Sequence, residues 1–380
     1  MKIIKKIQKK IYNLLLFRRK SINSDYENNF NYFEKNELLL DEYINCQGMI
    51  FHNFNDENEK LSNLLYNFFR SNNFTLKDFS KIVSSKIIYN KTGITPDDLQ
   101  QLLVEHYSRS NGLFQDVLHN LLNVEPINKL SKSSISSDIF GIVSSEEINT
   151  FVLKIKNDGY IILPKLVSIE KINRIKNWSY DIKYNVVDYF EKRYLVDKVD
   201  FQNPNVITAN ALEEDLEINE DITSLIFDPV IIEIISKYLG IEKPALIHLC
   251  MWWTFKSNNI MGSSEAAQLY HYDLDHIKWL KVFIYLTDVG NEDGPHVYIP
   301  KSHKSGNKNY KLLERGYSRV NDNEMSQFQK IEPKKVLGPA GSIIIGDTKC
   351  FHKGSPVISN PRLVLQPTFG PNNLLKINKK

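Results

Sequence analysis

The sequence contains few cysteines: there are three in 380 residues, and no two of them form a CxxC pair. Cys46, Cys250 and Cys350 lie far apart in the chain. An odd number of distant cysteines excludes the disulfide framework typical of small secreted domains. We therefore expect the protein in a reducing compartment, the cytoplasm.

Long hydrophobic runs are also missing from the basic N-terminal stretch. Its uncharged run covers residues 11–17, whereas a membrane-spanning helix needs about 20 apolar residues. A secretory signal is not expected, because Arg18, Arg19 and Lys20 stand where a cleavage site requires small residues. The sequence shows no internal repeat and no nucleic-acid-binding module, so nucleic acid is not an expected partner.

Acidic residues are absent from the first twenty positions, which hold eight lysines and arginines and leave 40 basic against 45 acidic residues elsewhere. Apolar residues recur at helical spacing within this stretch: Ile3, Ile4, Ile7, Ile11, Leu14 and Leu15. The pattern predicts a basic amphipathic helix over residues 1–20. Such a helix can lie on an anionic membrane surface as a peripheral contact. It can also pack on its own protein or remain solvated.

The remaining chain divides by pattern into four segments. Residues 21–130 are helical in pattern and form either a partner-binding extension or a helical layer packed on the next domain. A serine-rich run at 131–140 predicts a linker. Residues 141–372 are expected to form the catalytic domain, and residues 373–380 a basic tail. Nothing in the sequence indicates an oligomeric state.

The expected fold is mainly β with helical additions. Ser144 with Glu147 forms a capping-box pattern, and Asp228-Pro229 with Gly240 brackets a second helix. Apolar strand patterns follow over residues 245–255, 281–286, 342–347 and 362–365. Helices first and strands later fit a double-stranded β-helix, a jelly-roll or cupin-like barrel, preceded by a helix-rich N-terminal region.

The triplet His271-Tyr272-Asp273 is the strongest candidate for chemistry. Residues two apart on a strand project from the same face, so His271 and Asp273 could hold one metal ion. His352 could supply a third ligand, which makes the 2-His-1-carboxylate set of non-haem Fe(II) oxygenases. A lone His-x-Asp is weak evidence, because most such triplets lie on surfaces. The nearby Asp275 and His276 offer competing ligands.

Two further cations lie on predicted strands near this set. Arg362 begins an apolar strand, and a planar guanidinium suits bidentate binding of a carboxylate, which suggests a dicarboxylate cosubstrate. On the strand over residues 281–286, Lys281, Phe283 and Tyr285 share one face and could line the barrel interior. Lys281 could assist Arg362, or it could lie at the rim with its charge in water.

Three stretches, residues 144–164, 266–304 and 338–362, resemble the phytanoyl-CoA dioxygenase family. The blocks that carry the resemblance include YLTDV, DGP and SHK, followed by the gap from His352 to Arg362. The resemblance covers roughly residues 140–370. One departure is Lys301, which stands where the family has a glycine, so the turn there is expected to differ.

The resemblance implies Fe(II), 2-oxoglutarate and O₂ as cofactor and cosubstrates. It implies that His271, Asp273 and His352 are the catalytic iron ligands and that Arg362 binds the distal carboxylate of 2-oxoglutarate. Phe283 matches an aromatic position against the cosubstrate, and Ser355 lies near a position that places a hydroxyl on it. The implied enzyme is a dioxygenase that hydroxylates a small-molecule substrate, since halogenases of this type lack a carboxylate at the position of Asp273.

The substrate is less constrained by the sequence. Residues 301–319 carry six lysines and arginines against one acid, Glu314. In the family that the chain resembles, such insertions often border the mouth of the active site, so the resemblance implies an anionic substrate that is phosphorylated or carboxylated. Combined with the basic helix at residues 1–20, the run also suggests a lipid-linked or glycan precursor. A solvated loop explains the same residues. Two other functions remain open: a metal-binding barrel with non-oxygenase chemistry, and a catalytically silent, membrane-recruited interaction protein.

The other histidines of the predicted catalytic domain receive structural interpretations. His248 lies in an apolar strand and is expected to be a core histidine, while His296 and His303 are expected to be structural or to face substrate.

Overall fold

The computed structural model describes residues 102, 105–107, 133–190, 192–201, 203–256, 267–274, 278–304, 312, 319–328 and 331–370. The predicted helix at 1–20, most of the predicted extension at 21–130 and the basic tail at 373–380 lie outside these residues. So do the competing ligands Asp275 and His276. None of the described helices is long and apolar enough to cross a membrane. The described residues from 133 to 370 belong to one compact unit.

Three sheets form the β part of this unit. The largest has eight strands in the order β3-β11-β8-β13-β7-β6-β4-β5, a second has the order β10-β9-β12, and β1 pairs with β2. The strands are β1 (Ser134–Ser137), β2 (Gly141–Ser144), β3 (Tyr160–Ile162), β4 (Tyr184–Asp188), β5 (Arg193–Val196), β6 (Val206–Ala211), β7 (Ala245–Thr254), β8 (Leu280–Tyr285), β9 (His296–Tyr298), β10 (Lys334–Val336), β11 (Ile343–Gly346), β12 (His352–Gly354) and β13 (Arg362–Gly370). Every pairing within these sheets is antiparallel. The arrangement is the predicted double-stranded β-helix.

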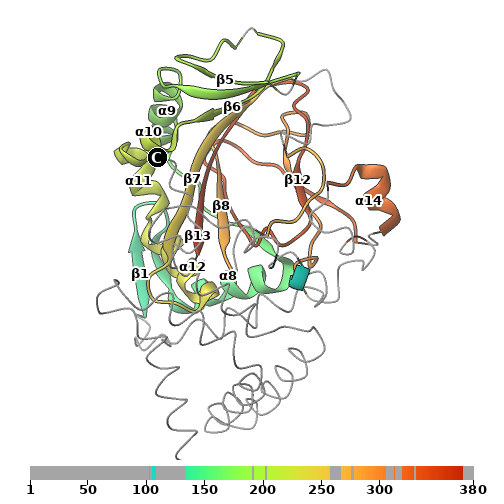
Figure 1. The fold of residues 1–380 in the computed structure, drawn as a ribbon. Helices are drawn as coiled ribbons and strands as arrows, with labels where there is room; N and C mark the ends of the chain where they lie inside the picture. Colours follow the sequence, from blue (N-terminus) through green and yellow to red (C-terminus); the bar gives the residue numbers. More distant parts are fainter. Residues whose placement is uncertain are drawn as a thin grey trace, which may run out of the picture. The chain divides into compact units, whose positions relative to one another are not determined.

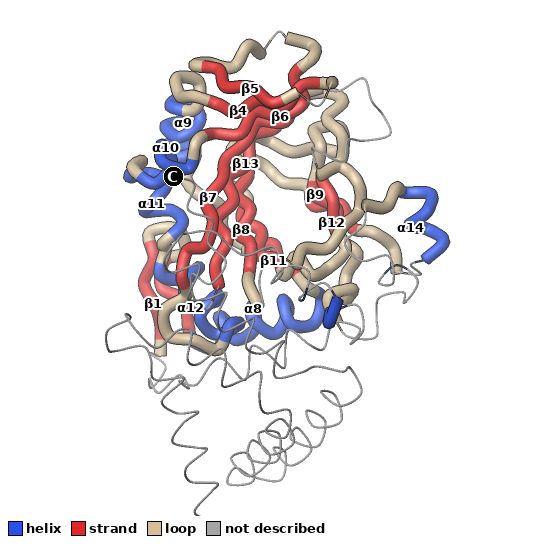
Figure 2. The backbone as a smooth tube through the Cα atoms, in the orientation of Figure 1, coloured by secondary structure: helices blue, strands red, loops and turns tan. Residues whose placement is uncertain are grey.

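Helices cover one face of the large sheet (Figures 1 and 2). They are α8 (Ser145–Asp158), α9 (Ile169–Trp178), α10 (Glu213–Glu217), α11 (Glu220–Ile226) and α12 (Pro229–Leu239), and a further helix, α14 (Asp322–Phe328), lies near β12 in these views. The hydrophobic core between helices and sheet includes Val282, Ile284 and Leu286. The opposite face of β8 carries Phe283 and Tyr285, which pack with Tyr298 of the smaller sheet. The predicted alternation along residues 281–286 is therefore confirmed.

Both predicted helix caps are present. Ser144 accepts a hydrogen bond from the Glu147 amide at the start of α8. Asp228 accepts from the Val230 and Ile231 amides at the start of α12, and Pro229 occupies the first turn. Each helix ends at a glycine with positive φ, a conformation that glycine adopts without steric cost. Local sequence thus fixes where these two helices begin and end.

Gly159 ends α8 directly against the region of the site. A Cβ atom at Gly159 would lie 2.1 Å from the Cys350 sulfur and 2.8 Å from His303. The Asp347 amide also donates to the Gly159 carbonyl at 2.8 Å. Only glycine allows this close approach. The end of α8 is thereby fixed against the segment that leads into His352.

The serine-rich run is more ordered than a linker. Residues 134–137 form β1, which pairs with β2, and Ile135 packs against the core. The Ser137 hydroxyl donates to Asp228 at 2.5 Å, which joins this hairpin to the start of α12. Burial alternates along β1: Ile135 and Ser137 face the interior, while Ser134 and Ser136 are exposed. The buried face and the hydrogen bond of Ser137 explain why this serine-rich run forms a strand and not a flexible linker.

Candidate metal and cosubstrate site

Two histidines meet where two chain segments pair. His271 and His352 form an antiparallel bridge, in which the His271 amide donates to the His352 carbonyl at 3.0 Å and the reverse bond is 2.8 Å. The Asp273 amide donates to the Thr348 carbonyl at 2.9 Å. The predicted strand through the triplet is reduced to this bridge, and residues 272–274 lie in a loop. The backbone bonds nevertheless hold all three side chains in place.

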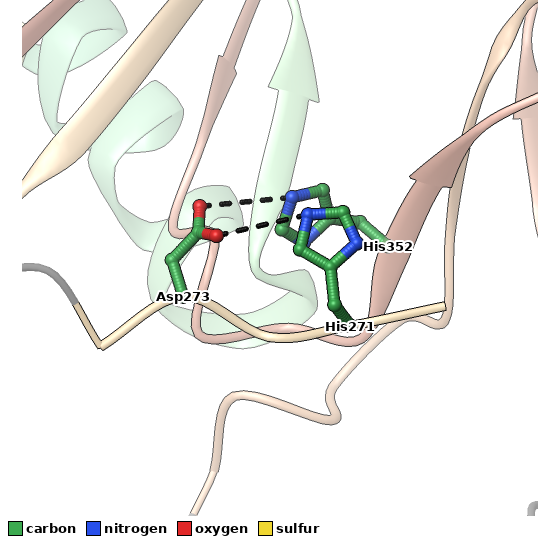
Figure 3. A group of neighbouring side chains, drawn as sticks. All are labelled: His271, Asp273 and His352. Carbon is green, nitrogen blue, oxygen red and sulfur yellow. Dashed lines mark ion pairs between the residues drawn. The ribbon is translucent and has the colours of Figure 1, made fainter. Parts of the chain in front are cut away.

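The three side chains converge in the interior (Figure 3). One ligand atom from each of His271, Asp273 and His352 lies within 4.8 Å of the others. Asp273 Oδ1 is 3.7 Å from His271 Nε2, and Oδ2 is 3.7 Å from His352 Nε2. All three residues are buried. Among the described residues, this is the group of histidine, cysteine and acidic side chains whose geometry could hold a metal ion.

Hydrogen bonds fix which nitrogen of each histidine faces the carboxylate. His271 Nδ1 lies 2.9 Å from the Leu269 carbonyl, and His352 Nδ1 lies 2.9 Å from the Cys350 carbonyl. A carbonyl oxygen only accepts, so each Nδ1 carries the proton and donates it. Each Nε2 therefore has a lone pair directed toward the space shared with Asp273. This is the usual support for a metal-binding imidazole.

Lys281 makes the shortest contact with the proposed ligand set. Its Nζ donates to Asp273 Oδ2 at 2.6 Å. Burial alone would raise the pKa of Asp273, but the charge of Lys281 beside it holds that pKa well below its ordinary value. Asp273 is therefore ionised at neutral pH. The structure places Lys281 on this carboxylate, an arrangement that neither sequence interpretation of Lys281 includes.

Three buried imidazoles predict how stability depends on pH. Burial lowers the pKa of His271, His296 and His352 below the ordinary value of 6.5. Below that pH the unfolded chain binds protons that the folded chain does not. The free energy of unfolding of metal-free protein should fall by up to about 1.4 kcal/mol per pH unit for each histidine.

Denaturation of chelator-treated protein between about pH 7.5 and 5.5 measures this slope. The variant His248→Asn removes an exposed histidine and should show the same slope as the wild type. A stability that is flat or rises on acidification would contradict neutral buried imidazoles.

Arg362 is a buried cation without an acidic partner among the described residues. The residue is 3% exposed, and its guanidinium donates to the Gly294 carbonyl and, at 3.4 Å, to the Thr254 hydroxyl. Within the part of the chain that the structure describes, its Nε has no hydrogen-bond partner. Burial lowers the pKa of Arg362, although a guanidinium stays protonated in proteins. A buried, partly unsatisfied guanidinium is costly unless an anion binds it, so this position suits a carboxylate ligand.

Aromatic rings fill the interior between these groups. Phe283 contacts the His296 ring at a centroid distance of 4.3 Å, and the Tyr285 hydroxyl donates to the Val336 carbonyl at 2.9 Å. Tyr298 stacks on His352 at 5.7 Å. The sequence interpretation missed Tyr298, although its position two residues after His296 on a short strand indicates the same face. Water is thereby excluded from one side of His352.

The structure corrects two expectations outside the ligand set. His248 is exposed and not a core histidine, because it takes the outward position of the period-2 pattern on β7. Lys301 has a φ of 67°, the left-handed conformation that glycine favours. The turn therefore keeps a glycine-type backbone, at a cost of about 1–2 kcal/mol for a residue with a side chain. Ser355 is half-buried and donates its amide to Pro295, and a hydroxyl contact with cosubstrate stays a prediction.

Comparison with known proteins identifies the family of this barrel. The sequence profile described as Phytanoyl-CoA dioxygenase (PhyH) matches residues 155–362, more than half of the chain. The chain belongs to the phytanoyl-CoA dioxygenase family. Enzymes of this family use Fe(II), 2-oxoglutarate and O₂.

Three solved structures show a weaker likeness to this chain. The epimerase SnoN from nogalamycin biosynthesis is 16% identical, with 59% of this chain and 82% of that chain covered and a TM-score of 0.40. HygX from Streptomyces hygroscopicus, with nickel and 2-oxoglutarate bound, is 13% identical, with 60% of this chain and 88% of that chain covered and a TM-score of 0.42. EctD from S. alaskensis with bound Fe is 15% identical, with 65% of this chain and 83% of that chain covered and a TM-score of 0.41. No curated protein matches the sequence significantly.

The residues present fit the cofactor and cosubstrate of the family. Two Nε2 lone pairs and an ionised carboxylate offer the donor types that Fe(II) prefers, and they leave coordination positions open. The buried guanidinium of Arg362 offers a site for a carboxylate. The family assignment and the geometry are therefore consistent with each other.

Proposed function

We propose that this member of the phytanoyl-CoA dioxygenase family is a hydroxylase of a small, anionic organic substrate. His271, Asp273 and His352 would hold Fe(II), and Arg362 would bind the distal carboxylate of 2-oxoglutarate. The observation that carries the proposal is the buried group of two histidines and one carboxylate, in a barrel that also buries Arg362 with no acidic partner among the described residues. When bound, Fe(II) would let O₂ act as the oxidant while 2-oxoglutarate supplies two electrons: one oxygen atom enters succinate with loss of CO₂, and the other converts a C–H bond to C–OH.

Each residue of the chain has a defined task in this proposal. The Leu269 and Cys350 carbonyls keep both Nε2 atoms deprotonated, so the imidazoles bind metal without first losing a proton. The aromatic side chains of Phe283 and Tyr298 exclude water from the interior. Asp273 favours hydroxylation over halogenation, because its carboxylate fills the position that a halide would need.

Arg362 can orient the cosubstrate through two parallel hydrogen bonds. A carboxylate opposite a guanidinium accepts from two nitrogens at once, which fixes direction as well as distance. The Nε atom of Arg362 has no partner among the described residues and is available for one of these bonds. The Thr254 hydroxyl lies 3.4 Å from Nη2 and holds the other edge of the group. An anchor of this kind positions the opposite end of the dicarboxylate.

The test is iron-dependent turnover of 2-oxoglutarate. Anaerobically purified protein given Fe(II), 2-oxoglutarate and O₂ should release succinate slowly without substrate, and chelator should stop the release. Zn(II) is the matched control: it suits the same donor types but has no redox chemistry, so it should give no succinate. Absence of any iron-dependent succinate, with a panel of organic acids and phosphate esters added, would contradict the proposal. Zn-supported hydrolysis would favour a non-oxygenase barrel.

A further inference from the structure

The basic run at residues 301–319 contributes one described cation beside the proposed metal site. Lys308, Lys311 and Arg315 lie outside the described residues. Lys304 is directed to Asn157 near the end of α8, where its Nζ lies 3.5 Å from the amide oxygen. Arg319 is the last member of the run and is half-buried.

Backbone pairing places Arg319 opposite a proposed ligand. Tyr270 and Val320 exchange both backbone hydrogen bonds, at 2.8 and 2.9 Å. In this antiparallel register the residue before Val320 lies opposite the residue after Tyr270. Arg319 therefore faces His271, which is bridged on its other side to His352. Directly opposite residues of antiparallel segments project to the same face, with Cβ atoms about 5 Å apart.

The neighbouring residues Tyr270 and Lys353 show which side chains point away from the metal ligands. Lys353 Nζ lies 4.9 Å from the centre of the Tyr270 ring and donates to Asp322 at 2.5 Å. Lys353, Tyr270 and Asp322 therefore occupy the face that points away from the metal ligands. Since side chains alternate, Arg319 belongs to the face of His271 and His352.

Arg319 and His271 are opposite each other on neighbouring antiparallel segments, so the arginine side chain lies close enough to meet a molecule bound beside the metal. Arg319 stands on a different element from Arg362, which belongs to β13.

We propose that Arg319 binds the anionic group of the primary substrate, a carboxylate or a phosphate. The inference rests on the proposed function and specifies its substrate class. Arginine is suited to either group, because its planar donors match both geometries. Arg362 and Arg319 then bind two different anions, the cosubstrate and the substrate.

The experiment uses Mn(II) in place of Fe(II), saturating 2-oxoglutarate and inorganic phosphate as the probe. The ³¹P relaxation rate of phosphate reports binding close to the paramagnetic ion, and the ¹³C relaxation of labelled acetate gives the carboxylate arm. We expect enhanced relaxation in at least one arm for the wild type. The apparent dissociation constant should rise about tenfold or more in Arg319→Gln, and less in Arg319→Lys, which keeps the charge.

Lys304→Gln is the matched control, because it removes one charge of the same basic run at a site that contacts α8; its anion binding should equal that of the wild type. An equal anion affinity in the wild type and both Arg319 variants would overturn the inference, as would enhancement that arises only from direct coordination to manganese. Water-proton relaxation measures Mn(II) binding separately. If the protein binds Mn(II) but no anion, only this inference is contradicted. If the protein does not bind Mn(II), the proposed function is contradicted.

Discussion

Protein carrying His271→Ala should lose iron-dependent succinate release and should bind Fe(II) or Co(II) at least about 100-fold more weakly than the wild type. Outer partners of metal ligands already contribute about 10- to 100-fold to affinity, and a ligand itself contributes more. Alanine also leaves the second imidazole and a buried carboxylate without the third donor that closes the facial set. No described histidine, cysteine or acidic side chain forms another such group with His352 and Asp273.

Calorimetric titration of metal into apoprotein and a succinate assay measure the two effects. His248→Ala removes an exposed histidine from β7 and should leave both unchanged. Circular dichroism establishes that the His271 variant is folded. Wild-type turnover in a folded His271→Ala protein would contradict the ligand assignment.

Replacing Arg362 by leucine should raise the KM for 2-oxoglutarate by at least about 100-fold, with metal affinity little changed. Each hydrogen bond to a charged group contributes about 1.5–3 kcal/mol, and a bidentate pair has two of them. Leucine also removes a buried charge, so the free energy of unfolding of metal-free protein should not fall in proportion. The effect is therefore expected in cosubstrate binding and not in folding.

Initial rates of succinate release against 2-oxoglutarate concentration give the KM. Arg174→Leu is the matched control, because Arg174 is an arginine on the exposed face of α9, paired with Asp221. Its KM should equal that of the wild type. An Arg362→Leu protein with an unchanged KM would place the distal carboxylate elsewhere.

Local patterns in the sequence were sufficient for the helices and strands that frame the site. The caps at Ser144 and Asp228 involve residues within three positions of each other, so their chemistry is readable locally. The alternation along β8 predicted which side chains enter the barrel, because one face packs against helices and the other against Tyr298. The family resemblance added the expectation that His271 and His352, which are far apart in the chain, belong to one metal site.

Pairings between distant segments could not be predicted from these patterns. The contact of Lys281 with Asp273 depends on how β8 lies against the loop after His271. The position of Arg319 depends on the bridge between Tyr270 and Val320. Neither register leaves a local trace in composition or spacing. His248 shows the opposite error, since an apolar neighbourhood in sequence did not decide which face of β7 it occupies.

The contact between Lys281 and Asp273 allows the barrel to fold without a bound metal ion. A buried carboxylate without a counter-charge is strongly destabilising, and many metal sites fold only when the ion supplies that charge. Here the ammonium of Lys281 already neutralises Asp273 in the metal-free barrel, at 2.6 Å. When a metal ion binds, Asp273 exchanges the ammonium of Lys281 for the metal cation, and the chain is already folded. If His271, Asp273 and His352 hold iron as proposed, the barrel is expected to stay folded before iron binds.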